Sequence, residues 1–112
     1  MIVRSWRTQF DSERIAEYEQ FAQSISLPMF RQQKGCLGVF FFRIETMCEV
    51  LSLWDSRASV DKLSHSSTYA ATVEKIMATG MLCGKQSLLI YEAHGGFIDA
   101  RRLSKLLEAK SI

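Results

Sequence analysis

The sequence is poor in several residue types, and these shortages narrow what the protein can do. Its 112 residues include three cysteines, two histidines, one proline and no asparagine. Cys36, Cys48 and Cys83 are odd in number and lack metal-ligand spacing, which predicts free thiols in a reducing compartment. The histidines, His65 and His94, are distant in the chain, so no metal site is predicted.

Long hydrophobic runs and a leader segment are also missing. The longest apolar runs are far too short to cross a bilayer, and Met1-Ile2-Val3 leads directly into Arg4 rather than a basic, apolar leader. We therefore expect a cytoplasmic protein with no membrane partner.

The sequence also lacks a large excess of positive or negative charge. The formal net charge is +2, and the cations are scattered except for one group near the end: Arg101, Arg102, Lys105 and Lys110. This group is typical of a solvated helix face. No recognition motif accompanies it, so no nucleic-acid partner is expected.

What the chain does contain is enough apolar sequence for one domain with a real core. Hydrophobic residues make up 47% of the sequence and charged residues 23%. Alternation predicts a first strand over residues 2–9. Two strands rich in β-branched and aromatic residues follow at 37–44 and 48–54, joined by a turn at 45–47, and a fourth is predicted at 86–93.

Helices are predicted between these strands. Asp11-Ser12 caps an amphipathic helix that Pro28 should kink or divide and that Gly35 ends. A second helical region begins near Arg57, pauses at 65–67 and restarts over 68–78. Gly80 and Gly84 are expected to bracket a loop, and a short amphipathic helix is predicted at 97–109.

This order predicts an α+β fold of the ferredoxin-like βαββαβ type with an additional C-terminal helix. The domain should span 1–96, with a helical extension at 97–112. Both helices of such a fold cover one face of the sheet, yet strand 37–44 is apolar on both faces. Because an exposed apolar face is rare on monomers, we expect a homodimer that closes two open faces into a shared barrel. Alternatively, the C-terminal helix folds back over its own sheet.

The chain also resembles a known family, through several segments spread over residues 2–93. They are the opening Ile2-Val3-Arg4-Ser5-Trp6-Arg7, the stretch from Leu27-Pro28 to Gly35, the hairpin ending Leu53-Trp54-Asp55-Ser56, and the helix reaching Tyr69. In this pattern the chain is similar to the antibiotic biosynthesis monooxygenase-like family of dimeric α/β-barrel proteins.

The resemblance implies a small dimer with a pocket between sheet and helices. Some members oxygenate polycyclic aromatic or quinol-like substrates with molecular oxygen and no cofactor, and relatives degrade haem. In those members a tryptophan at the end of the third strand lies in the pocket, and Trp54 occupies that position. Its usual asparagine partner is absent here. The haem-ligating histidine falls near Val73, which cannot ligate iron, so haem degradation by that route is disfavoured.

Five residues are candidates for the site. In a ferredoxin-like sheet we expect strands 1 and 3 to be parallel neighbours, so Trp6 and Trp54 should lie at one sheet end and, with Tyr69, form a slot for a planar ligand. His65, where the second helical region pauses, is the candidate general base. Arg4 shares the face of Trp6, and its charge needs either a carboxylate partner or an anionic ligand.

The carboxylate partner of Arg4 could be Glu49 or Glu92. His94 is expected at the opposite end of the sheet from Trp54.

Two hypotheses remain for function. One is a cofactor-independent monooxygenase acting on a small planar aromatic or quinol-like molecule, with Trp54, His65 and Arg4 as catalytic residues. The other is a non-catalytic dimeric small-molecule-binding or sensing module.

Overall fold

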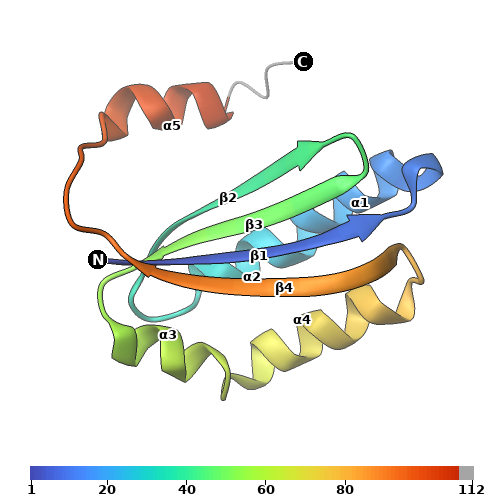
Figure 1. Cartoon of the computed structure of the whole chain (residues 1–112), viewed down its shortest axis with the longest axis horizontal. Helices are drawn as coiled ribbons and strands as arrows, with labels where there is room; N and C mark the ends of the chain where they lie inside the picture. Colours follow the sequence, from blue (N-terminus) through green and yellow to red (C-terminus); the bar gives the residue numbers. More distant parts are fainter. Residues whose placement is uncertain (109–112) are drawn as a thin grey trace.

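The structure is a computed structural model that describes residues 1–108. Its elements follow the predicted order with some helices divided. They are β1 (Ile2–Phe10), η1 (Ser12–Arg14), α1 (Ile15–Phe21), η2 (Ala22–Ser26), α2 (Leu27–Arg31), β2 (Cys36–Ile44), β3 (Met47–Trp54), α3 (Arg57–Leu63), α4 (Ser67–Ala78), β4 (Leu82–Glu92) and α5 (Ala100–Glu108). The predicted α+β ferredoxin-like fold is confirmed (Figure 1).

The four strands form one antiparallel sheet in the order β2-β3-β1-β4. β1 runs antiparallel to β3, with Ile2 opposite Trp54 and Trp6 opposite Val50. The prediction that the first and third strands are parallel is therefore wrong. The helical connection from β1 to β2 makes those two strands parallel, and β3, which forms a hairpin with β2, lies between them in the opposite direction.

The core lies on the face of the sheet that the helices cover. Strand alternation turns one set of side chains toward the helices, and on β1 this set includes Ile2 and Phe10. The buried residues on this side form two clusters: Ile2, Met29, Phe30, Val50, Trp54, Val60 and Leu63 in one, and Phe10, Tyr18, Phe21, Cys48 and Met81 in the other.

The other face of the sheet is uncovered, as predicted. Phe42 and Ile44 on β2 and Leu89 and Tyr91 on β4 are all exposed there. Phe40 stacks on Phe42 with the ring centroids 5.8 Å apart. The single sheet therefore presents an apolar surface that its own α1–α4 do not reach.

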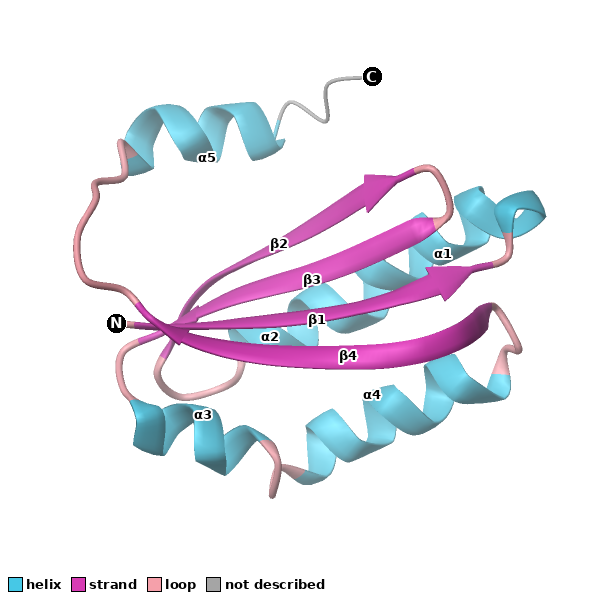
Figure 2. Cartoon of the chain, viewed as in Figure 1, coloured by secondary structure: helices cyan, strands magenta, loops and turns pink. Residues whose placement is uncertain are grey.

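Helix α5 lies apart from this open face. Figures 1 and 2 show it beyond β2, joined to β4 by a long connection. Leu106 is 69% exposed and Leu107 is 53% exposed, so the alternative in which this helix covers its own sheet is wrong. Asp99 caps the helix by accepting a hydrogen bond of 3.1 Å from the Arg102 amide, which explains its start at Ala100.

Some predictions about the tail remain open. Ala109 and Lys110, which the sequence placed in or beside the last helix, lie outside the described residues. The division into a domain at 1–96 and an extension at 97–112 stays a prediction. Within residues 1–108 no helix combines the length and the apolar character that crossing a membrane requires.

Pro28 divides the first helical region, as predicted, and it leaves a widened turn. Residues Ala22–Ser26 form a π-helix, and the Leu27 amide donates to the Ala22 carbonyl five residues back. Proline has no amide hydrogen, and its ring crowds the carbonyl four residues earlier, so a regular α-helix cannot continue through this position. The helix therefore enlarges one turn beside the sheet.

Gly35 fixes the turn between α2 and β2, and its replacement by alanine gives the first stability prediction. Its φ is +87°, and an added Cβ would overlap Ser59 Oγ and lie 2.8 Å from Asp55 Oδ1. We expect Gly35→Ala to lower the free energy of unfolding by about 2–3 kcal/mol, measured by urea unfolding.

The matched control for this prediction is Gly95→Ala. No atom lies within 4 Å of a Cβ built at Gly95, so this variant should match wild type within about 0.5 kcal/mol. Equal stability of the two variants would contradict the assigned role of Gly35.

Candidate active site

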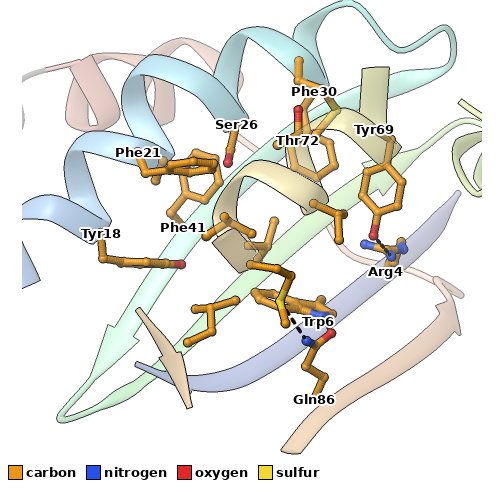
Figure 3. A pocket seen from close by; sticks show the side chains of 17 residues that line it. Arg4, Trp6, Tyr18, Phe21, Ser26, Phe30, Phe41, Tyr69, Thr72 and Gln86 are labelled. Atoms are coloured by element: carbon orange, nitrogen blue, oxygen red, sulfur yellow. Dashed lines mark hydrogen bonds between the residues drawn. The ribbon is translucent and has the colours of Figure 1, made fainter. Parts of the chain in front are cut away.

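A partly open cavity lies between the sheet and the helices (Figure 3). The sheet forms its floor, the helical region from α1 to α2 forms one wall, and α4 forms the other. Its volume is about 80 Å³. The lining residues are mostly apolar and aromatic: Arg4, Trp6, Tyr18, Phe21, Ala22, Ser26, Met29, Phe30, Phe41, Val50, Tyr69, Thr72, Val73, Ile76, Met77, Leu82 and Gln86.

Arg4 and Tyr69 meet at one end of this cavity (Figure 3). Arg4 Nη2 donates a hydrogen bond of 2.9 Å to Tyr69 Oη. The Arg4 Cζ atom lies 5.4 Å from the centroid of the Tyr69 ring, within the range of a cation–π interaction. Ser66 caps α4 by accepting a hydrogen bond from the Tyr69 amide, and this cap fixes the helix end that carries Tyr69.

The mouth of the cavity is formed by Trp6, Met77 and Gln86. Trp6 Nε1 donates a hydrogen bond of 3.2 Å to Gln86 Oε1, and Gln86 Nε2 lies 3.6 Å from Met77 Sδ. Met77 is half exposed, and methionine adapts its shape readily because it is unbranched and has several rotatable bonds. This part of the lining can move without disturbing the sheet.

The opposite end of the cavity is closed by Tyr18, whose hydroxyl points inward (Figure 3). The Tyr18 ring stacks on Phe10 with the centroids 5.1 Å apart. Burial, with a hydrogen bond to Cys48 as a smaller contribution, raises the pKa of Tyr18 far above its ordinary value. This phenol therefore stays protonated and neutral.

Of the five residues that the sequence named, three line the cavity together: Arg4, Trp6 and Tyr69. Trp54 is not among the lining residues. It has no exposed surface, and its Nε1 donates a hydrogen bond of 2.8 Å to Ser52 Oγ in the core. Because β1 and β3 are antiparallel, Trp54 lies about four residues, or roughly 13 Å, from Trp6 along the sheet.

The histidines lie outside the cavity. His65 is exposed between α3 and α4, with Nδ1 at 3.1 Å from the Asp61 carbonyl oxygen. His94 follows β4, and β4 ends beside Ile2 and therefore on the side of Trp54. Its predicted position at the opposite sheet end is wrong, because β3 and β4 both run antiparallel to β1.

The expected salt bridge of Arg4 with Glu49 or Glu92 is also wrong. No carboxylate of residues 1–108 lies within 4.0 Å of the Arg4 guanidinium. Glu49 points to the open face of the sheet, where Oε2 accepts a hydrogen bond of 2.6 Å from Ser5 and lies 3.4 Å from Arg7 Nε.

Several lining residues were missed by sequence reasoning. Tyr18 is one of the buried residues of α1, and an apolar position in an amphipathic helix predicts burial without indicating a cavity. Gln86 and Thr72 are ordinary polar residues in their elements. Val73 also lines the cavity. Among the described residues no group of three or more His, Cys, Asp or Glu side chains could hold a metal ion.

Comparison of sequences finds no matching protein-family model and no curated relative. Comparison of structures is informative. The fold matches an antibiotic biosynthesis monooxygenase with a TM-score of 0.69, 16% identity, and coverage of 85% of this chain and 100% of the other. It also matches a conserved protein from Methanosarcina mazei with a TM-score of 0.68, 16% identity, and coverage of 82% and 92%.

A third similar structure is a variant of SnoaB, a cofactor-independent oxygenase from Streptomyces nogalater, in which an asparagine is replaced by alanine. Its TM-score is 0.69 at 11% identity, with coverage of 85% of this chain and 94% of the other. The fold of the chain is thus that of the antibiotic biosynthesis monooxygenases, which confirms the family resemblance at the level of fold.

Proposed function

We propose that the protein is a cofactor-independent monooxygenase acting on a small planar aromatic or quinol-like substrate. The observation that carries this proposal is the cavity of a monooxygenase-like fold, lined by Trp6, Tyr69 and other aromatic residues. Flat aromatic walls with one cationic group suit a planar ring with an ionisable oxygen.

The cavity size limits the substrate. Its volume of about 80 Å³ is below the roughly 150 Å³ of an apolar cavity that takes up benzene. Entry of even one ring therefore requires the mouth to open, and Met77 and Gln86 can move to allow it. This favours a single-ring quinol over a polycyclic substrate.

The chemistry needs no added reductant. A substrate phenolate transfers an electron to molecular oxygen, and recombination of the two radicals at the neighbouring ring carbon, which carries one hydrogen, gives a hydroperoxide once the proton released by the phenol returns to the peroxide. Loss of water then leaves one oxygen atom as a new carbonyl, and both hydrogens of that water come from the substrate. The contribution of the protein is to hold the anion beside Arg4 and to exclude water from the reacting atoms.

Oxygen uptake with a panel of single-ring hydroquinones tests this function, with three-ring anthrones as the larger comparison compounds that should react more slowly. Val73→Trp should fill the cavity from α4 and lower the rate at least about tenfold, because a filled site cannot bind substrate. Glu74→Trp, one residue along on α4 and outside the lining, should leave the rate unchanged. Equal uptake by both variants, or no uptake above buffer by wild type, would rule the proposal out.

The second candidate function is a non-catalytic small-molecule-binding or sensing module. It is favoured by one observation: within residues 1–108 no histidine or carboxylate lines the cavity. Thermal-shift measurements with the same compounds separate the two functions, because a ligand of the native state raises the melting temperature whether or not it is turned over.

We also propose that the protein is a homodimer joined through the open face of the sheet. Phe42, Ile44, Leu89 and Tyr91 expose large apolar surface on this face, and contiguous surface of this kind is rare on monomers. A second copy supplies the same apolar face, so packing the two sheets together covers both.

A further inference from the structure

Arg4 is a buried cation without a carboxylate partner. It is only 7% exposed, on the helix-facing side of β1. Its one hydrogen bond to a side chain of residues 1–108 goes from Nη2 to the neutral Tyr69 hydroxyl. Removing a charge from water costs several kcal/mol unless an opposite charge compensates it, so the structure leaves a place for an anion.

Arg4 lines the cavity, and its remaining guanidinium nitrogens keep accessible surface. Tyr69 engages one nitrogen, and no buried nitrogen or oxygen of a described side chain lacks a partner, so the remaining Arg4 donors border open space. Figure 3 shows Arg4 at one end of the cavity, with Trp6 on the adjoining wall. A guanidinium presents its donors in a planar fork that matches two oxygen atoms of one anion.

We infer that the natural ligand is a planar aromatic anion whose carboxylate or phenolate oxygen binds Arg4 while its ring packs against Trp6. This inference rests on the proposed function for the location of the site and adds the two contacts of the ligand: an anionic oxygen on Arg4 and the ring against Trp6. The cavity is otherwise largely apolar, so the anionic group fixes the orientation of the ring.

Isothermal titration with benzoate and benzamide tests the inference, because these two planar molecules differ mainly in charge. Wild type should bind benzoate about 10- to 100-fold more tightly than benzamide, the range for a charge-assisted hydrogen bond. Arg4→Gln should remove this preference while leaving benzamide binding within about threefold. Arg43→Gln, which removes an exposed cation outside the lining, should leave both affinities unchanged.

Arg4→Lys is the second variant in case the glutamine variant does not fold. It keeps the charge without the planar fork, and benzoate should bind with intermediate affinity. Equal affinity of wild type for benzoate and benzamide, or unchanged benzoate binding in a folded Arg4 variant, would overturn the inference.

4-Nitrophenol distinguishes the two anion types, because its phenolate absorbs visible light. If the natural ligand is a phenolate, wild type should lower the apparent pKa of bound 4-nitrophenol, and Arg4→Gln should not. Benzoate binding without this shift assigns the site to carboxylates. Failure of the proposed oxygenase would appear as benzoate binding without oxygen uptake. Failure of this inference would appear as uptake or binding that is insensitive to ligand charge.

Discussion

Trp54→Ala is expected to lower the free energy of unfolding by about 3–5 kcal/mol, the usual cost of removing a buried tryptophan. Trp54 has no exposed surface and packs in the cluster that includes Ile2 and Leu63. Truncation leaves a void in the core and removes the donor to Ser52 Oγ. Urea unfolding followed by circular dichroism measures the loss.

Two comparisons show whether this loss reflects packing. Trp54→Phe keeps an aromatic ring and should cost less than half as much. Trp6→Ala removes a residue that is only half-buried and should also cost less, but it should abolish ligand binding because Trp6 forms a wall of the cavity. A stable Trp54→Ala protein that has lost only activity would instead support the catalytic role expected from the family resemblance.

The double variant Phe42→Lys/Leu89→Lys is expected to be monomeric where wild type is a dimer. The two residues lie on the edge strands of the sheet and share its open face. Phe42 is opposite Glu49, so in the monomer a lysine at position 42 can pair with this carboxylate. In the dimer, each lysine would be buried without a partner at a cost of several kcal/mol, weakening association by more than roughly 100-fold.

Sedimentation velocity measures this change over a range of protein concentrations. The matched control is Val73→Lys/Met77→Lys, which adds the same charge to exposed apolar residues of α4, away from the open face. It should sediment as wild type does. A monomeric wild type, or a double variant that remains dimeric, would contradict face-to-face association.

Much of the fold could be predicted from the sequence because local signals agree with the tertiary structure. Alternation and caps located most elements to within a few residues, including the break between α3 and α4. The direction of β3 relative to β1 was the main error. The strand order fixes this direction. β3 pairs with both β2 and β1, which are parallel to each other, so in an antiparallel sheet β3 must run opposite to both.

The start of β4 was missed for a local reason. Gly84 was interpreted as the end of a loop, but it lies inside the strand with φ of +94°, near a register shift opposite residues Arg7 to Gln9. A glycine at positive φ can mark a β-bulge as well as a loop. Sequence alone does not separate these, because the outcome depends on whether a neighbouring strand is present.

The site was only partly predictable for a physical reason. Alternation correctly placed Arg4 and Trp6 on one face, and helix periodicity brought Tyr69 toward them. Trp54 shares that face, yet packing of α2 and α3 buries it. A cavity forms where side chains from different elements do not fill the space between them. The pattern of a single strand or helix does not show where this happens.

The irregularities in strand pairing also bear on how the sheet can grow. Both edge strands carry one: β4 near Gly84 and β2 between Cys36 and Gly38. Such irregularities interrupt the row of free backbone groups that would otherwise accept another strand, and they protect natural proteins from edge-to-edge aggregation. Strand addition is therefore disfavoured at the start of each edge strand, whereas residues 38–44 of β2 and 87–92 of β4 keep regular pairing and depend on other protection.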